Sequence, residues 1–183
     1  EKLIKKKTFL VAVSGGPDSL ALTVLSKIYS KEQKSKIFFV LIDHGVRLNS
    51  SKEAKAVKFL LKKKKINLVI LRNKEKINKN IQSQAREVRY KLLLNFCNKK
   101  KIKFILTGHH RDDQIETFLI RLSRGSGIQG LSSMKKVSNL DNKTKLIRPL
   151  LNQKKNELII LAKQYFGKFF KDPSNDNQKY LRT

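Results

Sequence analysis

The sequence predicts an α/β fold in which a parallel five-stranded sheet carries helices on both faces. Short apolar runs alternate with longer segments of helical periodicity along the 183 residues. The runs are apolar at consecutive positions, which is typical of parallel strands that are covered on both faces. Because the sequence shows no internal repeat and no Gly/Ser-rich linker, we expect one domain over residues 1–183.

The first half of the chain contains three predicted strands and two predicted helices. Residues 8–13 form a β-branched apolar run that ends at Ser-Gly-Gly-Pro, and helical spacing follows from about 18 to 30. A second apolar run covers 36–42. A serine pair then caps a helix over about 50–64, and residues 66–71 form the third strand. The apolar face of the second helix consists of Ala54, Val57, Leu60 and Leu61.

The second half continues the alternation. A long helix is expected over about 81–100, and a fourth strand follows at 103–107. The next helix, about 112–122, stops at an Arg-Gly-Ser-Gly sequence. Residues 145–147 form a weaker fifth strand, and a last helix covers 154–166.

The composition points to a polyanionic partner. The sequence contains 42 Lys+Arg and 14 acidic residues, so its net charge is +28. This charge favours nucleic acid as a partner. The alternative explanation for the many lysines is a genome of biased composition. The single cysteine excludes an intramolecular disulfide and a cysteine-rich metal cluster. No apolar run approaches the ~20 residues of a membrane-spanning helix, so we expect no membrane partner. The expected location is the cytoplasm, or the stroma or matrix of an organelle for an organellar gene.

Three polar clusters follow predicted strands directly. They cover residues 14–19, 43–47 and 108–116. In parallel α/β sheets, ligands bind beyond the carboxyl ends of the strands. The three clusters should therefore form a single site.

The first cluster is a candidate phosphate loop. Its glycines permit a tight turn, and its amides, its hydroxyls and the helix dipole can face an anion. It is neither a Walker A loop nor a dinucleotide G-x-G-x-x-G motif, and a plain turn with a helix cap is the alternative. A carboxylate beside phosphate favours an intervening Mg²⁺ at Asp18. The predicted nucleotide-binding residues are Ser14, Gly15, Gly16, Pro17, Asp18 and Ser19, joined by Asp43 and His44, whose backbone could contact the adenine.

The third cluster contains three acids at helical spacing. Asp112, Asp113 and Glu116 could bind a cation, either a metal or an ammonium group, whereas favourable interaction with the helix dipole is the alternative explanation. Acids are scarce in this chain, so three of them within five positions suggest a site. His109 and His110 precede them, and one of the two is expected to face the phosphates.

Two further groups of basic residues flank these clusters. Arg86 and Arg89 lie three residues apart on one helix, where they can form a guanidinium pair for phosphate or remain a solvated face. Arg121, Arg124 and Gly125 belong to a basic loop along which a nucleic-acid backbone could lie.

Six motifs follow one another along the chain: S-G-G-P-D-S, D-H-G-V-R, A-R-E-V-R-Y, T-G-H-H-R-D-D-Q-I-E-T, R-P-L-L and D-P-S-N. In this order they resemble the N-type ATP pyrophosphatases, and among them the N-terminal catalytic domain of tRNA(Ile)-lysidine synthases. The resemblance runs from about Phe9 to Arg182 and is most specific over 107–134. It implies a Rossmann-like fold of the adenine nucleotide alpha hydrolase type. The family's C-terminal tRNA-binding domains are not expected in this chain, which ends at Thr183.

The resemblance also implies a reaction. ATP adenylylates the oxygen on carbon 2 of the wobble cytosine in a tRNA(Ile) with a CAU anticodon, and L-lysine then displaces AMP. In this reading the loop at 14–19 holds ATP, with Asp18 on Mg²⁺. His109 and Arg89 stabilise charge on the adenylate, and Asp113 and Glu116 recognise lysine or remove a proton. The partners would be this tRNA and L-lysine, and the oligomeric state is open, a homodimer included.

Two other functions remain as alternatives. A tRNA-thiolating enzyme with the same phosphate loop needs cysteines for sulfur or for an iron–sulfur cluster, and this chain has only Cys97. A non-catalytic RNA-binding module with a degenerate loop would not need the acids at 18, 113 and 116.

Overall fold

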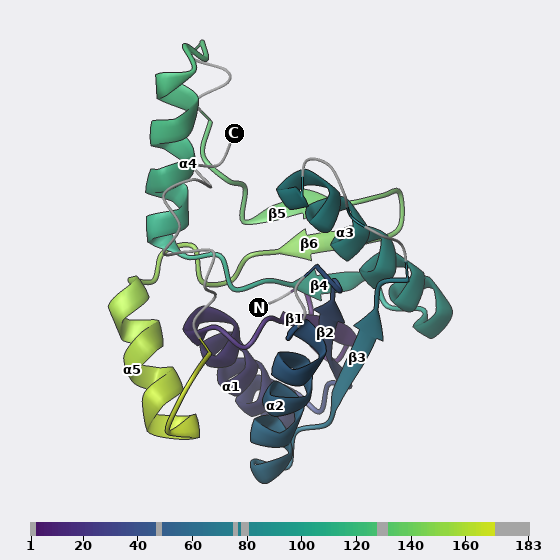
Figure 1. Ribbon diagram of the computed structural model, residues 1–183. Helices are drawn as coiled ribbons and strands as arrows, with labels where there is room; N and C mark the ends of the chain where they lie inside the picture. The colour runs from purple at the N-terminus through teal and green to yellow at the C-terminus, as the bar shows by residue number, and fades with distance from the viewer. Residues whose placement is uncertain (1–2, 47–48, 75–76, 78–80, 128–131, 171–183) are drawn as a thin grey trace.

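The computed structural model describes residues 3–46, 49–74, 77, 81–127 and 132–170. Its centre is one six-stranded sheet with the order β3-β2-β1-β4-β6-β5 (Figure 1). Five of the strands run parallel, as predicted, and only β5 is antiparallel to its neighbour β6. The strands are β1 (Phe9–Val13), β2 (Ile37–Asp43), β3 (Leu68–Arg72), β4 (Phe104–Leu106), β5 (Val137–Asn139) and β6 (Lys145–Ile147).

Helices cover both faces of the sheet, as the continuous apolar strands predicted. A larger core gathers side chains from α1, α2 and α5 against one face, and a smaller core packs α3 against the other. The four apolar residues predicted for the inward face of α2 are all buried. The helices are α1 (Pro17–Glu32), α2 (Ser50–Lys63), α3 (Ile81–Lys100), α4 (Arg111–Ser123) and α5 (Lys155–Phe166).

The strand order places a topological switch point in the middle of the sheet. β1 pairs with β2 on one side and with β4 on the other. The chain adds β2 and β3 to one side of β1 and the later strands to the other side, so the strand order reverses between β1 and β4. Connections from neighbouring strands leave toward opposite faces at such a point, which opens space beyond the strand ends. The turns after β1 and β4 both lie there, and they carry two of the three predicted polar clusters.

Two features depart from the expected five-stranded picture. β5 adds a sixth strand at the edge, where Val137, Ser138 and Asn139 pair with β6. Helix α4 has no buried residue and projects away from the body of the molecule (Figure 1). Arg47 and the D-P-S-N segment at 172–175 lie outside the described residues. Across the described part of the chain, no helix is long and apolar enough to cross a membrane.

Candidate functional site

The hydroxyl of Ser19 closes the turn after β1. Its Oγ accepts hydrogen bonds from the backbone N–H groups of Ser14 and Gly15, each at 3.1 Å, and donates to the Gly16 carbonyl at 3.0 Å. Gly16 is the N-cap of α1 and Pro17 occupies the first turn. The turn therefore leads directly into a helix N-terminus, where the dipole and the N–H groups favour an anion.

Glycines bring this turn close to its neighbours. Gly15 adopts φ +92°, and a Cβ there would lie 2.6 Å from Cγ2 of Val57. A Cβ at Gly108, just after β4, would lie 3.0 Å from the backbone carbonyl of Asp18. Because backbone cannot move aside as a flexible side chain can, glycine at 108 allows the end of β4 to pack on the first turn of α1. The first and third polar clusters thus meet, as the sequence predicted.

His110 lies between two of the predicted acids. The side chain is 4% exposed, and its Nε2 lies 3.6 Å from Oδ1 of Asp18 and 3.6 Å from Oδ2 of Asp113. Burial by itself lowers the pKa of His110, but its interaction with Asp18 and the charge of Asp113 outweigh this effect and raise the pKa. The His110 ring therefore links the phosphate-loop turn to the start of α4.

Asp113 also has a structural role. Its Oδ2 accepts a hydrogen bond from the backbone N–H of His110 at 2.9 Å, which caps the N-terminus of α4. Favourable interaction with the helix N-terminus, the alternative explanation for this acid, therefore accounts for part of the role of Asp113. Asp112 and Glu116 lie further out and are exposed.

His109 faces a positively charged environment. Thr107 Oγ1 lies 2.9 Å from its Nδ1. Burial lowers the pKa of His109 to about 4, and the guanidinium groups of Arg148, Arg86 and Arg89 add to this, although Asp113 opposes it. The ring is therefore neutral near pH 7, so it can donate a hydrogen bond to a ligand but supplies no positive charge.

The second polar cluster reaches the same region through His44. Burial lowers its pKa to about 4, and the charge of Arg89 contributes. The Asp43 carboxylate is engaged by protein groups: Ser51 Oγ donates to it at 2.6 Å, and the Gly45 N–H donates at 3.2 Å. Burial raises the pKa of Asp43, but these hydrogen bonds and Arg72 hold it below its ordinary value. The backbone carbonyls of Asp43 and His44 also accept hydrogen bonds, from the backbone N–H and the side-chain amide of Asn73 at 2.9 and 3.3 Å.

The predicted basic residues fall into two groups. Arg86 stacks on Tyr90, with its guanidinium carbon 5.2 Å from the ring centre, and it acts electrostatically on His109 together with Arg89. Arg124 and Gly125 lie at the opposite end of α4, about 20 Å along the helix axis from His110. In the same turn of α4, Arg121 donates to the Ser132 carbonyl. This second group is not brought to the strand ends.

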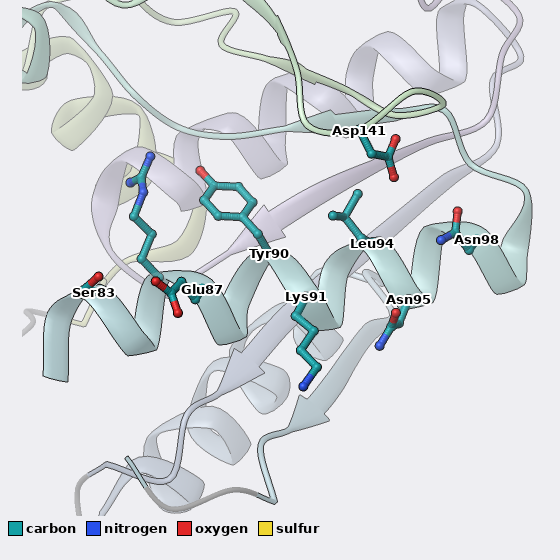
Figure 2. A pocket seen from close by; sticks show the side chains of 9 residues that line it. Ser83, Glu87, Tyr90, Lys91, Leu94, Asn95, Asn98 and Asp141 are labelled. Atoms are coloured by element: carbon teal, nitrogen blue, oxygen red, sulfur yellow. The ribbon is translucent and has the colours of Figure 1, made fainter. Parts of the chain in front are cut away.

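An open cavity of about 710 Å³ lies against α3. Figure 2 shows Tyr90, Leu94, Asn95 and Asn98 along the helix, with Asp141 facing them from the turn between β5 and β6. Asp141 already accepts hydrogen bonds from the N–H groups of its own turn, at 2.8 Å from Lys143. The cavity is therefore a mixed polar and apolar hollow that runs along α3 from Ser83 to Asn98.

Arg148 follows β6 directly and is not among the predicted site residues. Its side chain is buried, and its charge acts on His109 and is in turn affected by Arg86. The available signal was an arginine directly after a predicted strand, in a chain with many more lysines than arginines. What the sequence could not show was burial.

The described residues contain no group of three His, Cys, Asp or Glu side chains that could hold a metal ion by themselves. Asp18 does fit a shared metal, because its Oδ1 is buried and its polar neighbour, His110 Nε2 at 3.6 Å, is too distant for a hydrogen bond. A Mg²⁺ ion held by one carboxylate and by phosphate oxygens needs no larger protein cage.

Comparison with known proteins identifies one family, several curated relatives of similar sequence and a solved structure of similar fold. The tRNA(Ile)-lysidine synthase of Orientia tsutsugamushi is 44% identical over 176 residues, which cover 94% of this chain and 39% of that protein. The enzyme of the same name from Wolbachia pipientis wMel is also 44% identical, over 94% of this chain and 41% of its own length. This chain thus spans about two fifths of the curated relatives that it matches.

A solved structure supports the fold. The U34-tRNA thiolase from Methanococcus maripaludis, solved with its [4Fe-4S] cluster, superposes with a TM-score of 0.78 over 94% of this chain and 62% of its own, at 22% identity. This likeness concerns the arrangement of strands and helices. The sequence itself matches the PP-loop domain family over residues 1–183, and the chain therefore belongs to that family.

Proposed function

We propose that this protein joins L-lysine to carbon 2 of the wobble cytidine of a CAU-anticodon tRNA(Ile), using ATP and releasing AMP and pyrophosphate. The observation that carries the proposal is the position of His110, whose Nε2 lies 3.6 Å from both Asp18 and Asp113. It places the turn that suits a phosphate beside the acids that suit an ammonium group. The 44% identity to lysidine synthases supports the choice of substrates.

The first step forms the adenylylated tRNA. The cytosine O2 attacks the α-phosphorus of ATP, a new O–P bond forms, and the bond to the β-phosphate breaks to release pyrophosphate. The turn at 14–19 would hold the phosphates at the N-terminus of α1. Asp18 would hold a Mg²⁺ ion, which when bound neutralises phosphate charge. Arg89 would add positive charge at the adenylate, and the neutral ring of His109 would donate a hydrogen bond.

The second step forms the carbon–nitrogen bond. The lysine amine attacks carbon 2 as a neutral nucleophile, the bond from carbon 2 to the activated oxygen breaks, and AMP leaves. Asp113 and Glu116 would bind the ammonium groups of lysine or accept the proton that the amine loses. Asp113 would do so while it caps α4.

The experiment measures both steps separately. The protein is incubated with ATP, labelled lysine and a CAU-anticodon tRNA(Ile), and pyrophosphate release and label in the RNA are followed. We expect both, and we expect neither with a tRNA whose wobble base is not cytidine. The variant Asp113→Ala should keep tRNA-dependent pyrophosphate release and lose most lysine transfer. Intact lysine transfer in this variant would remove Asp113 from the second step.

The same experiment separates the alternatives. A non-catalytic RNA-binding module would bind tRNA and release no pyrophosphate. A thiolating enzyme would release pyrophosphate without incorporating lysine. The state of Cys97, the only cysteine in the sequence, argues against thiolation. Its thiol is buried, and its pKa is raised to about 12, chiefly by burial. A thiol held in this form is a poor nucleophile.

A further inference from the structure

Arg148 is a buried cation with an unusual set of partners. The residue is 8% exposed and follows β6 directly. Its Nη1 donates to the Lys135 carbonyl at 2.8 Å and to Ser138 Oγ at 3.0 Å. Its Nε is buried and has no hydrogen-bond partner. Only one nitrogen of the guanidinium is therefore accounted for by these contacts.

No carboxylate compensates this charge within the described residues. No Asp or Glu there forms an ion pair with Arg148, and the neighbours that act on it electrostatically are Tyr90 and Arg86. Burial lowers the pKa of Arg148, and the like charge of Arg86 lowers it further. A buried charge without a partner is costly, and proteins usually compensate it with an opposite charge or a set of hydrogen bonds.

The buried acid of the same sheet shows what compensation looks like. Asp43, 4% exposed, accepts hydrogen bonds from Ser51 and from the Gly45 N–H and lies 3.9 Å from Arg72. Arg148 has no comparable anionic neighbour, although it lies among the cations around His109. A buried guanidinium that has no acid among its own electrostatic neighbours, at the carboxyl edge of a parallel sheet, fits a ligand that supplies negative charge itself.

We infer that Arg148 binds an oxyanion at this edge of the sheet and that, resting on the proposed function, the oxyanion is a phosphate group of the nucleotide. A residue that is 8% exposed can be reached by a small anion that enters the site, whereas a tRNA backbone phosphate approaches from the surface. Arginine rather than lysine also fits, because a planar guanidinium can donate through Nε and another nitrogen at once. Arg148 is thus a third guanidinium for the nucleotide beside Arg86 and Arg89.

The test compares nucleotide binding in the absence of tRNA. Titration calorimetry measures the Kd of Mg²⁺–ATP for the wild type, for Arg148→Gln and for Arg148→Lys. Lys145→Gln is the matched control, because it removes one positive charge from the exposed start of the same strand. We expect at least tenfold weaker binding for Arg148→Gln, an intermediate loss for Arg148→Lys, and a change of less than twofold for Lys145→Gln.

A measurement on the wild type covers the case in which Arg148→Gln does not fold. The arginine Nε–H resonances are followed by NMR as Mg²⁺–ATP is added, with Arg148 assigned by its missing signal in Arg148→Lys. We expect the Arg148 signal to shift on binding. An unshifted signal at saturation, or a folded Arg148→Gln protein that binds ATP within twofold of the wild type, would overturn the inference.

A tRNA arm distinguishes the source of the phosphate. The same variants are titrated with tRNA in the absence of ATP. A tenfold loss of tRNA binding with unchanged ATP binding would show that the phosphate belongs to RNA and overturn the assignment to the nucleotide. If the wild type forms no lysidine and Arg148 still governs ATP affinity, the proposed function fails and the anion site stands.

Discussion

Gly15 combines two requirements that no other residue type meets. Its φ of +92° lies in the left-handed region, and a Cβ would lie 2.6 Å from Val57. We expect Gly15→Ala to lower the free energy of unfolding by about 2–4 kcal/mol, from backbone strain and from the collision. ATP affinity should fall with it, because the turn cannot keep its shape. Chemical denaturation and ATP titration provide the two measurements.

Gly45→Ala is the matched control for this prediction. Gly45 also has a positive φ, +68°, but no atom lies within 4 Å of the position of its Cβ. Only the backbone strain remains, and we expect a loss of about 1 kcal/mol. Equal losses for the two variants would mean that contact with Val57 contributes nothing.

His44 and His109 make stability depend on pH. Their pKa values in the folded protein are lowered from 6.5 to about 4. As pH falls from about 6.5 toward 4, the unfolded chain takes up protons first, so stability decreases over this window. We expect about 1–2 kcal/mol to be lost per histidine between pH 7 and 5. His110, with a raised pKa, gains stability in the acid direction and offsets part of this loss.

His44→Asn isolates one of these contributions. Denaturation curves at pH 7 and pH 5 give the loss of unfolding free energy for the wild type and for the variant. The variant should lose about 1–2 kcal/mol less than the wild type between these two values. An identical loss in both proteins would exclude His44 as a source of the pH dependence.

At the residue scale, the sequence could indicate candidate site residues but not the contacts between them. Asp18 and Asp113 stood out because each directly follows a strand-ending motif in an acid-poor chain. Their connection through His110 could not be foreseen, since it depends on the close packing that Gly108 permits. Arg148 was not predicted as a site residue for a related reason. Only the fold reveals that its side chain is buried and forms no ion pair with a described acid.

At the scale of elements, the long apolar strands were the most predictable. β1 and the first six residues of β2, 37–42, are consecutive apolar residues that are covered on both faces, so burial and sequence pattern agree. β5 was missed because Val137, Ser138 and Asn139 lie at an edge where none of them is buried. Such a strand is defined by its pairing with β6 rather than by its own composition.

Helix α4 differs from the other helices in how little it depends on the core. Its apolar residues Ile115, Leu119 and Leu122 are more than half exposed, at 51%, 55% and 52%. We expect Leu119→Ser to change the free energy of unfolding by no more than about 0.5 kcal/mol, because no packing is lost. Leu61→Ala, at a fully buried position on α2, should cost about 2–5 kcal/mol. A large loss for Leu119→Ser would show that its side chain packs against the protein.

At the scale of the whole molecule, parallel strand order unites the site. Each cluster lies at the carboxyl end of its own strand, and the order β2-β1-β4 places these ends side by side. This convergence follows from topology alone, which explains why the meeting of the clusters was predictable. Individual distances depend on side-chain packing and were not.

The charge of +28 gives the molecule a measurable dependence on salt. If this charge serves tRNA binding, cations released from the RNA make the affinity fall steeply as salt rises. We expect the affinity for tRNA to drop by at least about 100-fold between 50 and 200 mM salt, since even a few phosphate contacts produce such a slope. Binding of Mg²⁺–ATP, measured in the same buffers, should weaken far less, because a single nucleotide carries no condensed layer of counterions to release. Similar, shallow slopes for both ligands would indicate that the lysine-rich surface reflects composition and does not bind RNA.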